Sequence, residues 1–67
     1  MEPYQQRVVE ELKEIEGRRE KICAFLESEK GKQLPEAEKR RMTRQYFILN
    51  LYELVLEERI ANFPVPV

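Results

Sequence analysis

The chain has 67 residues, a formal net charge of -1, no histidine and one cysteine, Cys23. A single cysteine excludes an intrachain disulfide, and the absence of histidine excludes a Cys/His zinc site. Residues 1–67 form one domain, which would bury only about 60% of its unfolded surface if it folded alone. Self-association is therefore the expected source of stability, because small domains need some form of cross-link or assembly.

The first predicted helix runs from about residue 3 to residue 29. Pro3 suits a first helical turn, where its missing N–H is not needed. Apolar residues then recur at intervals of three and four, with Arg19 in the one polar position, in a heptad-like stripe made of Val8, Leu12, Ile15, Ile22 and Leu26. Gly17 costs about 1 kcal/mol relative to alanine in a helix. Gly17 indicates either a slight bend of the helix or a close approach by another backbone or a ligand. Alternatively, it is a tolerated glycine on an exposed face.

A turn is predicted over residues 30–34 and a second helix over residues 35–62. Gly31 is a natural stop because glycine accepts a positive φ angle. Pro35 suits the first position of the next helix. Pro64 cannot continue a helix, so residues 63–67 form an irregular tail.

The second helix has two apolar stripes. We expect the first to face the first helix; it contains Met42, Gln45, Leu49, Tyr52, Leu56, Arg59 and Phe63. The second contains Ile48, Leu51 and Val55, with Phe47 and Leu54 beside it. Nine of the eleven residues 46–56 are apolar or aromatic, and a helix that is apolar nearly all round must be buried on several sides. The second stripe is therefore the predicted subunit interface.

These patterns predict an all-α fold, an antiparallel hairpin of two long helices that assembles into a compact homo-oligomer. The apolar segment is too short for a bilayer, which takes about 20 apolar residues, so no membrane partner is expected. Nor does the N-terminus have an apolar region typical of a secretion signal. The predicted core consists of Val8, Leu12, Ile15, Ile22, Phe25, Leu26, Leu49, Tyr52, Leu56 and Ile60.

Catalysis is not expected from this composition. Histidine, the commonest general base at neutral pH, is absent, and the two aliphatic hydroxyls, Ser28 and Thr43, lie in no recognisable motif. The sequence also has no glycine-rich phosphate loop and no metal-ligand spacing. We therefore predict a protein that is not an enzyme and that uses no cofactor and no metal.

Two arginines, Arg19 and Arg59, fall in otherwise apolar stripes. A guanidinium in such a position can extend to solvent, pair with a carboxylate or bind an anion through its planar fork. Arg18 adds a donor on the adjacent face. Tyr4 is either incidental or a platform for a nucleobase. The basic run Lys39, Arg40, Arg41 and Arg44 reads as a solvated face, or else as a short nucleic-acid patch.

The chain resembles a known family in the order and spacing of several short segments. The segments are Tyr4-Gln5-Gln6-Arg7-Val8-Val9-Glu10-Glu11, Phe25-Leu26-Glu27-Ser28, Leu34-Pro35-Glu36-Ala37-Glu38, Gln45 and Leu56-Glu57-Glu58-Arg59-Ile60-Ala61-Asn62-Phe63. They are similar to those of the small phage anti-CBASS proteins, which act as sponges for cyclic oligonucleotides. The resemblance covers nearly the whole chain.

This resemblance implies a hexameric particle that binds bacterial cyclic di- and trinucleotides, such as 3′,3′-cGAMP, between subunits without cleaving them. It places the protein in the cytoplasm of an infected bacterium. The ligand contacts that it implies are Tyr4, Arg18 and Arg59, with Arg19 as the alternative to Arg18. Two other readings stay open: an oligomeric protein-interaction module that captures a host helix, and a weak RNA or DNA binder that uses the basic run.

Overall fold

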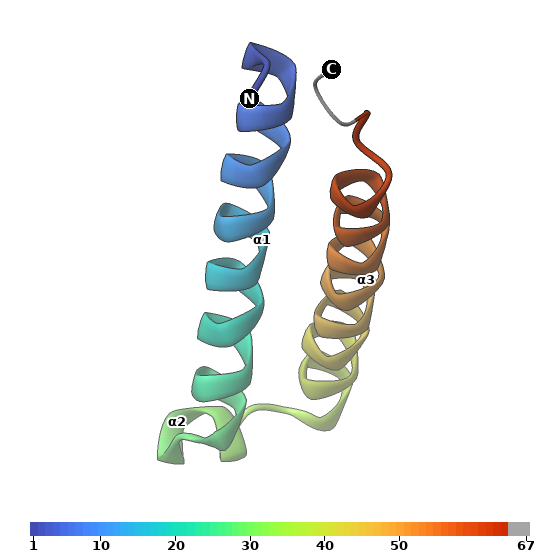
Figure 1. Ribbon diagram of the computed structural model, residues 1–67. Helices are drawn as coiled ribbons and strands as arrows, with labels where there is room; N and C mark the ends of the chain where they lie inside the picture. The colour runs from blue at the N-terminus through green and yellow to red at the C-terminus, as the bar shows by residue number, and fades with distance from the viewer. Residues whose placement is uncertain (65–67) are drawn as a thin grey trace.

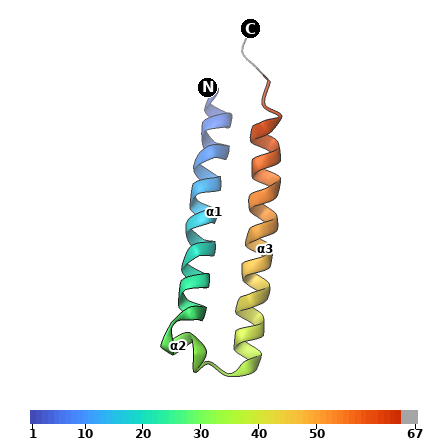
Figure 2. The same ribbon diagram turned by 60° about the horizontal axis from the view of Figure 1, so that its bottom comes forward.

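The computed structural model describes residues 1–64, and all its regular structure there is helical. Helix α1 spans Pro3–Glu27, α2 spans Glu29–Lys32 and α3 spans Glu36–Ala61. The two long helices run antiparallel and side by side, and the termini lie together at the end opposite α2 (Figures 1 and 2). The predicted helical hairpin is confirmed, although α2 occupies the segment predicted as an open turn. The predicted tail falls partly outside the described residues.

Local hydrogen bonds define the ends of the long helices. Pro3 occupies the first turn of α1, and the Glu2 backbone N–H donates to the Gln5 side-chain oxygen at 2.8 Å. At the C-terminal end of α3, the Asn62 side-chain amide donates to the Glu58 carbonyl oxygen at 2.8 Å and Pro64 follows. Unpaired backbone groups at helix ends are thereby satisfied by side chains.

Gly31 lies at a crowded corner between α1 and α2, but not for the predicted reason. No glycine has a positive φ angle, and Gly31 is a buried residue within α2. Its backbone N–H donates to the Ser28 hydroxyl at 3.1 Å. A Cβ atom at Gly31 would lie 1.9 Å from the Phe25 carbonyl oxygen. Glycine is thus required by the close approach of two backbones, not by its conformational freedom.

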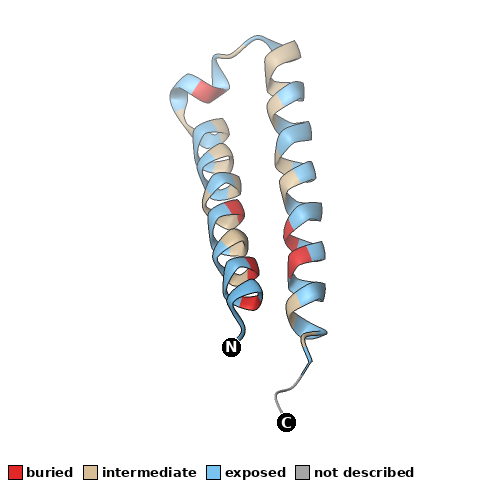
Figure 3. Ribbon diagram, turned by 90° about the horizontal axis from the view of Figure 1, so that it is seen from above, coloured by how far each residue is buried: buried red, intermediate tan, exposed pale blue. Residues whose placement is uncertain are grey.

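A narrow apolar core lies where the inner faces of α1 and α3 meet (Figure 3). Its buried members are Val8, Ile15 and Leu56, and four partly buried side chains pack against them, namely Leu12, Leu49, Ile60 and Phe63. The predicted core is right for six residues, namely Val8, Leu12, Ile15, Leu49, Leu56 and Ile60. Ile22 and Leu26 are half-buried but lie outside this cluster. The predicted core is wrong for Phe25 and Tyr52, whose exposed fractions of 37% and 39% place them at the edges of the contact.

The stripe of α3 that faces α1 is displaced from the predicted one. Gln45 and Arg59 are exposed, whereas Tyr46 is half-buried and Glu53 is buried. Both stripes alternate three and four residues, so spacing alone does not separate them. Burial of Glu53 instead of Tyr52 decides the register, and a carboxylate at that position was not foreseen.

The hairpin is long and thin, with extents of 54 × 15 × 13 Å. Its radius of gyration is 15.5 Å, whereas a compact chain of this length has about 11 Å. Its accessible surface is 5362 Å², and a compact monomer of this mass exposes about 4,500 Å². A large part of the surface that a globular domain would bury therefore remains uncovered. Among residues 1–64, no helix is long and apolar enough to cross a membrane.

Substituting the two glycines tests the role of Gly31 at the corner between α1 and α2, with Gly17 inside α1 as the control. We expect Gly31→Ala to destabilise the protein by more than about 1 kcal/mol, because the new methyl group collides with backbone that cannot move freely. Gly17→Ala should stabilise it by about 1 kcal/mol, since no atom lies within 4 Å of the added Cβ and alanine favours the helix. Urea unfolding followed by circular dichroism measures both. Equal changes in the free energy of unfolding for the two variants would contradict the close backbone approach at Gly31.

Candidate functional site

An ion pair crosses the contact between the long helices. The Arg19 guanidinium donates to the Glu53 carboxylate, and the exposed fractions of the two side chains are only 24% and 7%. The guanidinium also lies 6.0 Å from the centroid of the Tyr46 ring, within cation–π range. The hydrogen bond to Glu53 raises the pKa of Arg19, so this residue stays charged throughout the physiological range. Arg19 therefore belongs to the internal contact of the hairpin.

Arg18 differs from its neighbour because it faces solvent. Its guanidinium pairs with the Glu14 carboxylate at 2.8 Å, one turn away on the same helix, and both side chains are more than 60% exposed. Exposed pairs of this kind contribute about 0–1 kcal/mol and exchange readily. Arg18 can therefore leave Glu14 and pair with an incoming anion at little cost in free energy, whereas Arg19 cannot leave Glu53 so easily.

Tyr4 lies at the open end of the hairpin, where the two termini meet. Its ring packs edge-to-face on Phe63, with 5.8 Å between centroids, and 43% of its surface is exposed. The side-chain amide of Gln5, itself buried, donates to the Tyr4 hydroxyl at 3.4 Å. The aromatic ring is thus held in place by neighbours and still presents one side to solvent.

Arg59 was predicted to face the first helix, and the structure contradicts this. It is an exposed residue in the last turn of α3, where a positive charge is favoured by the helix dipole. Within residues 1–64 it has no ion-pair partner. Its guanidinium is available to an external anion.

One chain does not bring these candidates together. Tyr4 and Arg59 lie near the open end, and Arg18 lies 14 residues beyond Tyr4, which is about 21 Å along a helix. A ligand of nucleotide size cannot span that separation within one protomer. If Tyr4, Arg18 and Arg59 act on one ligand, they must come from different copies of the chain.

The outer face of α3 carries five of the nine exposed large hydrophobic residues in the described chain. Its exposed fractions range from 47% to 62% across Phe47, Ile48, Leu51, Leu54 and Val55. This matches the prediction that the second stripe has no partner inside the chain. Such a continuous exposed apolar surface is typical of a site for association.

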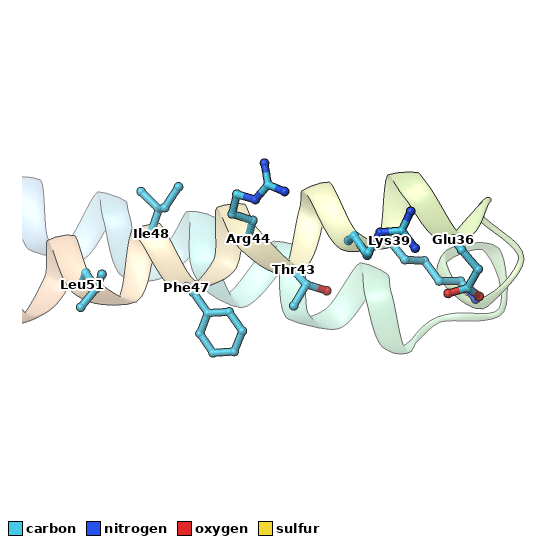
Figure 4. Close-up of a pocket in the computed structure, with 8 residues that line it drawn as sticks. Glu36, Lys39, Thr43, Arg44, Phe47, Ile48 and Leu51 are labelled. Atoms are coloured by element: carbon cyan, nitrogen blue, oxygen red, sulfur yellow. The ribbon is translucent and has the colours of Figure 1, made fainter.

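A groove of about 550 Å³ follows this face toward α2 (Figure 4). Side chains from one helix line it, in order Glu36, Lys39, Arg40, Thr43, Arg44, Phe47, Ile48 and Leu51. It is basic at one end and apolar at the other. Sequence reasoning treated the basic run and the apolar stripe as separate features, and the i, i+4, i+7 spacing of Arg40, Arg44 and Phe47 was the signal that joins them.

The role of Arg19 can be tested by substitution. Arg19→Met leaves the Glu53 carboxylate buried without its partner, so we expect the melting temperature to fall by at least about 4–8 °C. The double variant Arg19→Met/Glu53→Met should recover most of that loss, because two apolar side chains fill the same space. Thermal unfolding by circular dichroism measures both, with Arg18→Met as the exposed control. An unchanged melting temperature for Arg19→Met would contradict the role of Arg19 in the contact between the helices.

The comparison with known proteins covers almost the whole hairpin. The Sequestin family matches residues 2–62, which include α1, α2 and α3. No curated protein and no solved structure matches the chain. The family name fits the resemblance to the small anti-CBASS sponges. On the strength of this match, the chain belongs to the Sequestin family.

Proposed function

We propose that this protein is a phage immune-evasion protein that binds bacterial cyclic di- and trinucleotides and withholds them from their effector. The observation on which this rests is the match to the Sequestin family over residues 2–62, since the family name denotes sequestration. The resemblance to the anti-CBASS sponges supplies the class of ligand. The site of action is the cytoplasm of the infected bacterium, where the messenger is held without being cleaved.

Sequestration without cleavage suits the side chains of this protein. The sequence has no histidine. Within the described part of the chain, no three His, Cys, Asp or Glu side chains are grouped closely enough to hold a metal ion. The exposed side chains include arginines and aromatic residues, which can bind phosphates and bases. These side chains suit a binding role.

We further propose that the outer face of α3 is the subunit interface of a homo-oligomer, a hexamer by the resemblance. The surplus of exposed surface over a compact monomer is comparable to the roughly 800 Å² that each partner buries in a standard interface. Leu51 lies near the middle of the outer face and is 62% exposed. Assembly also brings arginines of different copies together, which one chain cannot do.

Within this assembly, Arg18 and Arg59 contact the phosphates and Tyr4 contacts a base. Arg18 and Arg59 are both exposed, while Arg19 is engaged by Glu53. A charged hydrogen bond contributes about 1.5–3 kcal/mol. The edge-to-face contact with Phe63 leaves the Tyr4 ring partly exposed for stacking.

The second candidate function is a protein-interaction module, and the exposed outer face of α3 favours it. An amphipathic helix of a host protein could cover the same apolar residues. The two functions differ in what they predict for the purified protein: a self-assembled sponge binds cyclic nucleotides, whereas an interaction module leaves Leu51 exposed and ignores them.

Native mass spectrometry of the purified protein, alone and with a panel of cyclic di- and trinucleotides, tests the proposal directly. We expect one discrete oligomer that retains unhydrolysed ligand. An oligomer that retains no member of the panel would contradict the sponge and favour the interaction module.

The proposed contacts predict the effect of removing each arginine. Arg18→Ala and Arg59→Ala should each weaken binding of 3′,3′-cGAMP by about 10–100-fold, the equivalent of one charged hydrogen bond. Neither should change the oligomer, because neither side chain belongs to the outer face of α3. Isothermal titration calorimetry measures the affinity, and Lys21→Ala on the same surface of α1 is the control. A variant that keeps full affinity would remove its residue from the site.

The proposed interface predicts a change of mass. Leu51→Asp should reduce the oligomer to the 8.1 kDa protomer, because a carboxylate cannot be buried unpaired in an apolar contact. Asn50→Asp, at the neighbouring exposed position, should leave the assembly intact. Light scattering after size-exclusion chromatography gives the masses. An unchanged mass for Leu51→Asp would place the interface elsewhere.

A further inference from the structure

We propose that the groove on α3 is a ligand-binding site in which Arg40 and Arg44 hold a phosphate and Phe47 stacks on a base. The inference rests on the proposed function and adds to it a surface distinct from Arg18 on α1. Its ligand class is a nucleotide with both a phosphodiester and an exposed base, as in a cyclic oligonucleotide. Three observations support it.

The first observation is a difference in pairing along the basic run. Lys39 pairs with Glu36 at 3.4 Å, and Arg41 pairs with Glu38 at 2.8 Å. Arg40 and Arg44 pair with no carboxylate in residues 1–64, and both line the groove. The run is therefore not a uniformly solvated face: the unpaired guanidiniums are the two that belong to the groove.

The second observation is the position of the aromatic ring. Figure 4 shows Arg44 and Ile48 on one side of α3, with Thr43 and Phe47 on the other. Phe47 is 58% exposed, and its ring packs edge-to-face on Tyr46 with 5.5 Å between centroids. The ring is thus oriented by a neighbour while a face stays open to a base.

The third observation is the size of the groove and its surroundings. Its volume of about 550 Å³ is comparable to that of small-ligand sites, although one helix alone lines the groove and leaves it largely open to solvent. Arg40 and Arg44 are one turn apart, so their Cβ atoms lie about 5–6 Å from each other and can fork onto one phosphate group. Phe47, Ile48 and Leu51 belong both to the groove and to the outer face, so the groove overlaps one end of the proposed subunit contact.

These features fit a compact nucleotide better than a nucleic-acid polymer. Only two unpaired arginines face the groove, and the chain as a whole has a net charge of -1. Polymer binding depends on many phosphate contacts along an extended basic surface. Here the basic part ends at once in an apolar surface, which offers no contact to further phosphates.

Calorimetric titration with 3′,3′-cGAMP at fixed salt tests the site. We expect Arg40→Ala/Arg44→Ala to weaken binding at least 100-fold and Phe47→Leu, which keeps an apolar side chain, to weaken it at least fivefold. The charge-matched control Arg41→Ala/Lys21→Ala removes two cations outside the groove and should stay within twofold. Native mass spectrometry and circular dichroism check that each variant keeps its oligomer and its helices. Arg40→Lys/Arg44→Lys, which keeps both charges, is measured alongside and should lose at least fivefold.

The outcomes separate this inference from the proposed function. If the wild-type protein binds the cyclic dinucleotide and Arg40→Ala/Arg44→Ala binds it equally well, the groove is not the site and the proposed function stands. If the wild-type protein binds no cyclic nucleotide, both fail. If a single-stranded oligonucleotide binds more tightly than 3′,3′-cGAMP with the same dependence on Arg40 and Arg44, the groove serves a polymer and the inference is overturned.

Discussion

Two helices packed along one line cannot cover the apolar residues that α3 contains, and this shortage of burial governs the rest of the molecule. Within residues 1–64, only Val8, Ile15 and Leu56 are buried large apolar residues, whereas five large apolar side chains on the outer face of α3 remain about half exposed. Hydrophobic burial is the main favourable term in folding. A hairpin this thin gains little of it alone, and the proposed assembly would supply the missing burial through contacts with other copies.

The ion pair between Arg19 and Glu53 fixes how the two helices meet. It lies in the internal contact, where it can orient one helix against the other, as buried polar groups do in coiled coils. It also separates two adjacent arginines by role: Arg19 is held inside by a carboxylate and an aromatic ring, and Arg18 remains outside on a weak surface pair. Two consecutive residues of α1 thus differ in role, because Arg19 holds the helices together and Arg18 presents its charge to solvent.

The fold was predictable from the sequence because helix signals are local. Pro3, Pro35 and Pro64 mark the ends, and apolar spacing identifies both long helices. The facing stripe of α3 was predicted correctly at Met42, Leu49, Leu56 and Phe63. It was one position off at Gln45, Tyr52 and Arg59. Tyr52 appeared the better core residue because Glu53 has a charge. Only the pairing of Glu53 with Arg19, which are 34 residues apart, makes its burial favourable. The groove was missed for a similar reason: only in the structure are Arg40 and Arg44 distinguishable from their paired neighbours.

A groove on one helix cannot by itself enclose a ligand. Small-molecule sites bury about 70–90% of a drug-sized ligand's surface, and the groove on α3 is lined by a single helix. In the proposed assembly, neighbouring subunits that pack on the apolar end of the groove supply the missing walls. Ligand and assembly are then coupled, because a ligand that contacts two copies binds only the assembled state and stabilises it by mass action. A short chain can in this way achieve tight sequestration with few contacts per copy, since each copy supplies only part of every site.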